Sequence, residues 1–237
     1  MADFILATNA RSPLPHDWPA LLVGVAVAAY WWRVLRMAYK MRRKTGRAAN
    51  FLPTEPLGRA LRLLWQPVVW IWIAQPFAVA FIDHLPMGVR PFAIPAVIRW
   101  LAALVAWVAF AATRLCWRRM GKSWRMGIDP SERTALVITG PYAFVRHPIY
   151  ALSSVMMIAT IVAVPTPLMI VVGVIHCLLL QWEARREERH LSSTHGDAYD
   201  RYRRDVGRFV PRSLRRYSPA ASATSAAAAE REPAHAP

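Results

Sequence analysis

The chain contains few charged residues and very few cysteines for a length of 237 residues. Only 19% of the residues are charged, and the 14 Asp and Glu are outnumbered by 30 Lys and Arg. The two cysteines, Cys116 and Cys177, both lie in apolar runs. They form neither a disulfide framework nor a metal-binding spacing, so we expect no metal site. The N-terminal residues also lack the basic start and apolar core of a cleaved signal peptide.

The sequence is instead rich in long apolar runs. Hydrophobic residues make up 55% of it, with 11 Trp, yet the formal net charge is +16. This combination fits either a nucleic-acid binder or a membrane protein with basic loops, and the length of the runs separates the two. A helix needs about 20 apolar residues to span a bilayer, with a range of roughly 17 to 25. Three runs meet this requirement and two shorter ones follow, at residues 18–38, 63–82, 94–117, 150–164 and 167–182.

These runs predict an all-α integral membrane protein with about five transmembrane helices. Only Pro165-Thr166-Pro167 stands between the last two runs, which therefore read as a tight helical hairpin. Helices of soluble proteins are rarely apolar all round, which makes a soluble bundle the weaker alternative. We expect three membrane helices in residues 1–117, helices four and five in residues 118–212, and a disordered tail of Ala, Ser and Pro in residues 213–237.

Basic residues are distributed unevenly between the loops. Most Arg and Lys lie in the segments after the first, third and fifth runs, and the opposite loops contain almost none. The positive-inside rule therefore places the N-terminus outside and the C-terminus in the cytoplasm. This accounts for the charge without a nucleic-acid partner. The Ala- and Arg-rich composition and the lack of a eukaryotic retention signal favour a bacterial inner membrane; the sequence indicates no oligomeric state.

A compact polar cluster precedes the fourth run. Gly140 can adopt positive φ and Pro141 lacks an N–H, so together they turn the chain. Pro148 suits the first turn of a helix, which we expect to start near His147. The amides and dipole at that helix end favour an anion, and Arg146 and His147 add donors.

The cluster also contains aromatic faces. Tyr142 and Tyr150 can attract a cation within about 6 Å. A ligand that carries both a carboxylate and a positive centre, such as S-adenosylmethionine, fits the whole set. The alternative is an interfacial anchor, in which the basic residues bind lipid phosphates.

Acidic residues are so scarce that the adjacent pair Glu187-Glu188 stands out. These carboxylates can accept hydrogen bonds from ribose hydroxyls or an amine, or act as a base. The alternative is a solvated helical face on which they pair with arginines such as Arg185. A second polar residue, His176, lies inside the fifth run and faces either a neighbouring helix or a pocket.

Together, these segments resemble the isoprenylcysteine carboxyl methyltransferase family and related integral-membrane methyltransferases. The resemblance covers residues 121–211 and rests on the order and spacing of several motifs. These are Gly-Lys-x-Trp at 121–124, Leu136-Val137, G-x-Y-x-x-x-R-H-P-x-Y at 140–150, a helical hairpin, E-E-x-x-L at 187–191, G-x-x-Y-x-x-Y at 196–202 and Val210-Pro211.

The resemblance implies that S-adenosylmethionine binds in a cytosol-facing pocket closed by a C-terminal helical segment. A lipid or prenylated acceptor would reach the methyl group from the bilayer for in-line displacement. The matching cofactor-binding residues are Thr134, Leu136, Val137, Tyr142, His147, Pro148, Tyr150 and Glu187. Catalytic roles are expected for Glu187, Glu188 and Arg146. A carboxylate acceptor needs no base, whereas an amine would pass its proton to one of the two glutamates.

Two positions depart from the family pattern. Glu183 stands where relatives commonly have an arginine associated with the substrate carboxylate, and His195 replaces an aromatic residue. A prenylcysteine carboxylate is therefore one acceptor among several, and a phospholipid or amine N-methyltransferase is an alternative. A membrane reductase that resembles sterol reductases and uses NADPH is another alternative, as is a lipid-binding scaffold without activity.

Overall fold

The computed structural model describes residues 14–45, 56–121, 124 and 135–219. Within these ranges the chain is helical and contains no strand, which confirms the predicted all-α class; one isolated bridge joins Val145 to Gly207. The elements in chain order are α1 (Trp18–Thr45), α2 (Pro56–Phe81), α3 (Ala96–Met120), the 3-10 turn η2 (Gly140–Ala143), α4 (Pro148–Ala163), α5 (Pro167–His195) and α6 (Asp197–Asp205).

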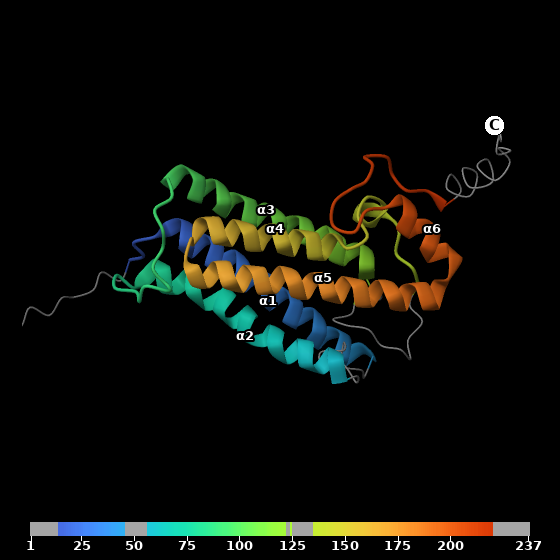
Figure 1. The fold of residues 1–237 in the computed structure, drawn as a ribbon, viewed down its shortest axis with the longest axis horizontal. Helices are drawn as coiled ribbons and strands as arrows, with labels where there is room; N and C mark the ends of the chain where they lie inside the picture. The colour runs from blue at the N-terminus through green and yellow to red at the C-terminus, as the bar shows by residue number, and fades with distance from the viewer. Residues whose placement is uncertain (1–13, 46–55, 122–123, 125–134, 220–237) are drawn as a thin grey trace, which may run out of the picture.

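Helices α1 to α5 form one elongated bundle, and α6 lies beyond its end (Figure 1). Four of them, α1, α2, α3 and α5, are long and apolar enough to cross a membrane. The expected fifth span is not confirmed, because α4 has only 16 residues. At 1.5 Å per residue it extends about 24 Å, which is short of a hydrocarbon core of about 30 Å. It packs against α1, α3 and α5.

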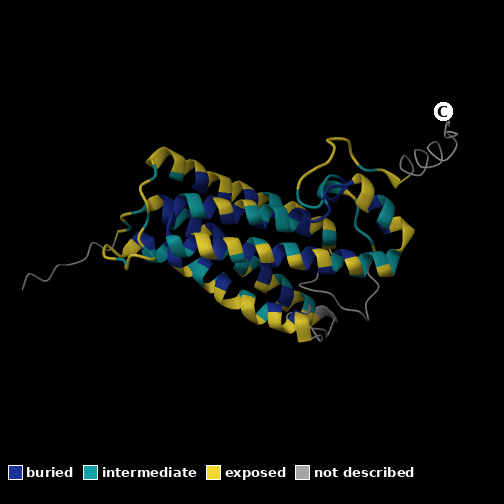
Figure 2. Cartoon of the chain, viewed as in Figure 1, coloured by how far each residue is buried: buried dark blue, intermediate teal, exposed yellow. Residues whose placement is uncertain are grey.

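The bundle buries one face of each helix and exposes apolar side chains on the other. Trp72, Met156 and Met157 are fully buried in the centre. Large apolar residues such as Trp70 and Leu104 point outward, and Figure 2 shows exposed residues along the outer faces of α2 and α3. Exposed apolar surface on several neighbouring helices is what lipid would cover. The chain therefore has the organisation of an integral membrane protein.

Helix α5 continues well beyond the expected end of its apolar run at Trp182. It continues there because charge replaces the apolar periodicity while Glu, Arg and Ala remain strong helix formers. The helix stops at Gly196, whose φ of +52° is the left-handed conformation common just after a helix. The glutamate pair consequently lies on the same rigid helix as the membrane segment.

Polar side chains inside the bundle hydrogen-bond across helices. Trp65 Nε1 donates to His176 Nδ1 at 3.3 Å, and His176 Nε2 lies 3.1 Å from Ser153 Oγ. Since Nδ1 accepts, the ring is neutral with its proton on Nε2, which donates to Ser153. His176 thus faces α2 and α4, which decides between the two orientations left open by the sequence.

Arg99 joins three helices at the opposite end of the bundle from α6. Its guanidinium contacts Asp17 Oδ2 at 2.5 Å through Nη2, and it donates to the carbonyl of Ala163 at 2.8 Å from Nε and 2.7 Å from Nη2. Asp17 also accepts the amide of Ala20 at 3.0 Å, which caps the start of α1. One cation therefore ties the start of α3 to the start of α1 and the end of α4.

Some of the sequence predictions fall on residues that the structure does not describe. Most of the predicted disordered tail, residues 220–237, lies outside the described residues, and so does Thr134. The proposed division into three regions remains a prediction.

Candidate functional site

The turn before α4 adopts the conformation that its sequence predicts. Gly140 has a φ of +65°, and a Cβ there would lie 3.0 Å from Arg119 Nε, so both backbone and space favour glycine. The chain then makes the 3-10 turn η2, and α4 begins with His147 as N-cap and Pro148 in its first turn. This geometry directs Arg146 and His147 toward α5.

The C-terminal segment at residues 206–217, called the strap below, crosses this turn. The amide of Arg146 donates to the carbonyl of Gly207 at 2.8 Å, and the amide of His147 donates to the carbonyl of Arg208 at 3.0 Å. Farther along, the amide of Tyr217 donates to the carbonyl of Ala143 at 3.0 Å. These backbone bonds fasten the strap to the start of α4.

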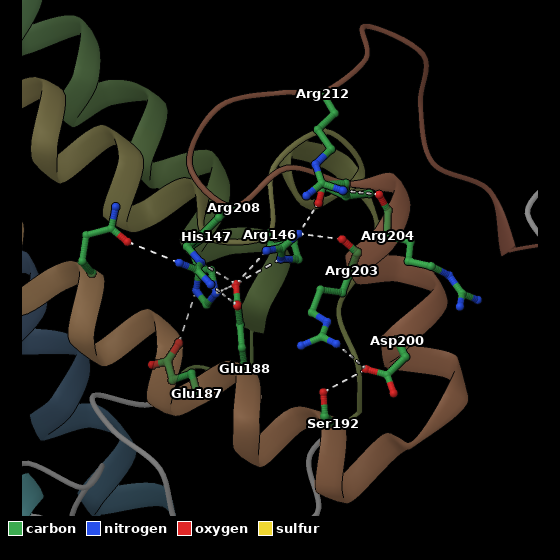
Figure 3. Close-up of polar contacts among 12 residues, drawn as sticks. Arg146, His147, Glu187, Glu188, Ser192, Asp200, Arg203, Arg204, Arg208 and Arg212 are labelled. Carbon is green, nitrogen blue, oxygen red and sulfur yellow. Dashed lines mark hydrogen bonds and ion pairs between the residues drawn. The ribbon is translucent and has the colours of Figure 1, made fainter.

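Glu188 is the centre of a buried ion cluster (Figure 3). Its Oε1 lies 3.0 Å from Arg146 Nη2 and 3.2 Å from His147 Nε2, and its Oε2 lies 2.6 Å from Arg208 Nη2. Arg146 also donates to backbone carbonyls of α6 and the strap, those of Arg203 at 2.8 Å and of Val206. The exposed fraction of the Glu188 side chain is only 5%. Its contact with Arg208 holds the strap, and it does not line the cavity described below.

Glu187 has different surroundings. Tyr150 donates its hydroxyl proton to Glu187 Oε1 at 2.5 Å, and His147 Nδ1 lies 3.4 Å from Oε2. Figure 3 shows Glu187 and Glu188 reaching His147 from different sides. The Glu187 side chain keeps 25% of its surface exposed and lines a cavity. Of the two glutamates, Glu187 is therefore the one placed to contact a ligand there.

His147 lies between the two carboxylates, and its ring stacks parallel to that of Tyr150 with centroids 5.5 Å apart. Burial lowers its pKa, but the hydrogen bonds and charges of Glu187 and Glu188 outweigh burial, and the pKa lies above its ordinary value. Because both ring nitrogens face carboxylates, the imidazolium form, in which both nitrogens are donors, is favoured.

The cavity has a volume of about 790 Å³, counting the open space at its mouth. It combines apolar walls with a few polar groups. Its lining includes Leu136, Val137, Tyr142, Arg146, His147, Pro148, Tyr150 and Glu187, together with Met120, Trp124, Leu191, Tyr199 and Tyr202.

Two tyrosine hydroxyls in this lining test whether a polar ligand fits. Those of Tyr142 and Tyr199 are buried and have no hydrogen-bond partner among the described residues. Burial also raises the pKa of both phenols, so they are neutral donors. Unpaired buried hydroxyls are costly unless a ligand or water satisfies them. A ligand with several acceptors, such as a nucleoside with an amino-acid tail, suits this set.

The structure brings nearly all of the sequence-predicted site residues into one place. Seven cofactor candidates and Arg146 line the cavity, Glu188 lies behind it, and Thr134 lies outside the described residues. Sequence reasoning assigned no role to Arg208 or Tyr199. Arg208 is one basic residue among many in its segment, so no local signal distinguished it, whereas Tyr199 was visible in the G-x-x-Y-x-x-Y pattern.

Comparison with protein families matches residues 97–198 to the phospholipid methyltransferase family. Comparisons with curated proteins and with solved structures found no match. The matched segment runs from α3 to the first residues of α6 and includes the predicted turn, His147, Tyr150 and both glutamates. It covers less than half of the chain and does not distinguish acceptors. The part of the chain that carries the candidate site is thus similar to a family of membrane methyltransferases, related to the one that the sequence motifs resemble.

Proposed function

We propose that the protein transfers a methyl group from S-adenosylmethionine to the amine of a membrane lipid. The observation that carries this proposal is a cavity lined mostly by the segment similar to phospholipid methyltransferases, in which Glu187, Tyr142 and Tyr199 stand among apolar residues. Its position at the basic end of the bundle agrees with the predicted cytoplasmic side.

The residues present suit such a cofactor. Tyr142 and Tyr199 would donate to its polar groups, and Leu136 and Val137 would contact its apolar parts. The imidazolium of His147 favours an anionic group nearby, such as a carboxylate. When bound, S-adenosylmethionine supplies a methyl group activated by a sulfonium cation.

The chain itself must prepare the acceptor. An amine attacks only when neutral, and Glu187 is the carboxylate in the cavity that can take its proton. Tyr150 and His147 hold this carboxylate in one orientation. The remaining contribution is positioning and exclusion of water.

An amine fits the site better than the prenylcysteine carboxylate that the sequence also allowed. Glu183 replaces the arginine that relatives commonly use for such a carboxylate, and it forms a buried pair with Arg186 at 3.1 Å. Another acidic residue, Glu187, lines the cavity. A carboxylate in the cavity wall disfavours an acidic acceptor beside it and favours a basic one.

The first experiment is calorimetric titration of the detergent-purified protein with S-adenosylhomocysteine and, separately, with NADPH. We expect saturable binding of the nucleoside alone. Binding of NADPH alone would replace the methyltransferase proposal with the reductase alternative.

Methyl transfer is then measured with phosphatidylethanolamine and with N-acetyl-S-farnesylcysteine. We expect transfer to the amine lipid, a loss of about 100-fold in Glu187→Gln, and normal activity in the exposed control Asp197→Asn. Transfer only to the farnesylcysteine would contradict the amine acceptor.

A further inference from the structure

A second chamber lies next to the candidate cofactor cavity and is lined by all five helices of the bundle. Its volume is about 510 Å³, counting its open mouth. Residues that represent the five helices are Trp31 of α1, Arg62 and Trp65 of α2, Trp117 of α3, Ser153 of α4 and Leu180 of α5. None of the described residues that line this chamber comes from the strap or α6. A ligand there would therefore contact mainly the membrane bundle.

The two chambers meet at three residues that line both: Trp124, Ile149 and Tyr150. Trp124 is the buried tryptophan of the Gly-Lys-x-Trp element. Tyr150 presents its hydroxyl to Glu187 on the cofactor side. A molecule in the second chamber would therefore contact residues that also line the cofactor cavity.

Arg62 is the only charged residue among the described residues that line this chamber. The other walls are aromatic or aliphatic, apart from the hydroxyls of Ser153, Tyr30 and Tyr150. An arginine recognises phosphate and carboxylate well, because its planar guanidinium forms paired hydrogen bonds with their oxygens.

Arg62 has neighbours on α2 and α5. Its guanidinium lies 5.8 Å from the ring centre of Trp65, and the Trp65 indole is held in turn by His176. Arg62 also interacts electrostatically with Glu183 on α5. A guanidinium has five N–H donors, more than one carboxylate can accept, so it can bind a ligand anion as well.

We propose that the second chamber receives the headgroup of the acceptor lipid and that Arg62 binds its anionic group. This inference rests on the proposed methyl transfer. An acceptor held by its phosphate at Arg62 would direct its amine toward Tyr150, which lines both chambers, and toward Glu187 in the cofactor cavity. Arg62 would thus act as a specificity residue that positions the acceptor without taking part in the chemistry.

Direct binding tests this proposal independently of catalysis. The detergent-purified protein, saturated with S-adenosylhomocysteine, is titrated with dihexanoyl phosphatidylethanolamine, with dihexanoylglycerol and with N-acetyl-S-farnesylcysteine. We expect saturable binding of the phospholipid and much weaker binding of the glyceride, which lacks the phosphate. Preference for the farnesylcysteine would make a carboxylate the anion that Arg62 binds. Equal binding of the glyceride and the phospholipid, or no saturable binding, would overturn the proposal.

The variants separate recognition from folding. Arg62→Gln should weaken phospholipid binding about ten- to hundredfold, the loss expected for one charge-assisted contact, and Arg62→Lys should restore part of it. Arg59→Gln, at an exposed position on the same helix, is the matched control and should bind normally. Affinity for S-adenosylhomocysteine should stay unchanged in all three variants. If the wild type does not bind S-adenosylhomocysteine, the methyltransferase proposal is contradicted. Equal phospholipid affinity in Arg62→Gln and wild type would contradict only the role of Arg62.

Discussion

Glu187 and Glu188 are neighbours in the sequence, yet their carboxylates belong to different parts of the molecule. Glu188 is buried under two arginines and holds the strap, whereas Glu187 lines the cavity and accepts the hydroxyl of Tyr150. Successive residues of a helix point in directions about 100° apart, so one pair can serve two purposes. Substitutions at the two positions should therefore have different consequences.

Glu188→Gln should loosen the strap. It removes the carboxylate opposite Arg146, whose side chain has an exposed fraction of only 5%. Removing one partner of a buried ion pair costs about 3–5 kcal/mol, because the other charge stays buried. Limited proteolysis should then cleave residues 206–217 much faster than in the wild type. Glu187→Gln is the matched control and should leave the strap resistant; equal cleavage of both variants would refute the division of roles.

His147 should make stability depend on pH. Its folded-state pKa lies above the ordinary value of about 6.5, which we take for the unfolded chain. The stabilisation from the imidazolium is therefore complete below that pH and is lost as pH rises through the folded-state pKa. In detergent at pH 6, the wild type should have a higher melting temperature than His147→Gln. The difference between the two melting temperatures should shrink toward pH 9. A difference that grows with pH would show the opposite sign of coupling.

Arg99→Gln should destabilise the end of the bundle remote from the site. It removes the cation from Asp17, a carboxylate with an exposed fraction of 12%, and from the terminal carbonyl of α4. We expect a loss of about 3 kcal/mol and a lower melting temperature with unchanged affinity for S-adenosylhomocysteine. Arg90→Gln, at an exposed position in the preceding loop, should melt like the wild type. A loss of ligand affinity with normal melting would contradict a purely structural role.

Gly140→Ala should distort the turn that directs Arg146 and His147. The residue has a φ of +65°, and the new methyl group would press on Arg119. Left-handed backbone costs an L-residue about 1–2 kcal/mol. The variant should therefore lose stability and bind S-adenosylhomocysteine more weakly. Gly88→Ala has no atom within 4 Å of the new Cβ and serves as control; similar losses in both variants would exclude a specific effect of the turn.

The sequence predicted the features that depend on run length or on local backbone chemistry. The apolar runs predicted the bundle, and Gly140 and Pro148 predicted a turn and a helix start. Several of the family motifs contain residues that line the cavity, among them Val137, Tyr142 and Glu187.

Features that depend on pairing between distant residues were not predictable. Arg208 reaches Glu188 across a fold that no local pattern encodes, and Arg62 was one basic residue among those counted for the predicted orientation. The apolar run of α5 ends at Trp182, and the charged second half continues the same helix to His195. Only the assembled structure distinguishes the two glutamates.

The strap is synthesised after α1 to α6 and is followed by only two more described residues. Helices α1 to α5 lie entirely before it, so the bundle can insert and pack before Arg208 exists to pair with Glu188. Fastening of the strap to the start of α4 and to Glu188 of α5 would then be a late, separate step of biogenesis. A nascent chain halted after α6 would already be anchored in the membrane and would contain every described residue that lines the cavity, while Glu188 still lacked Arg208, its partner at 2.6 Å.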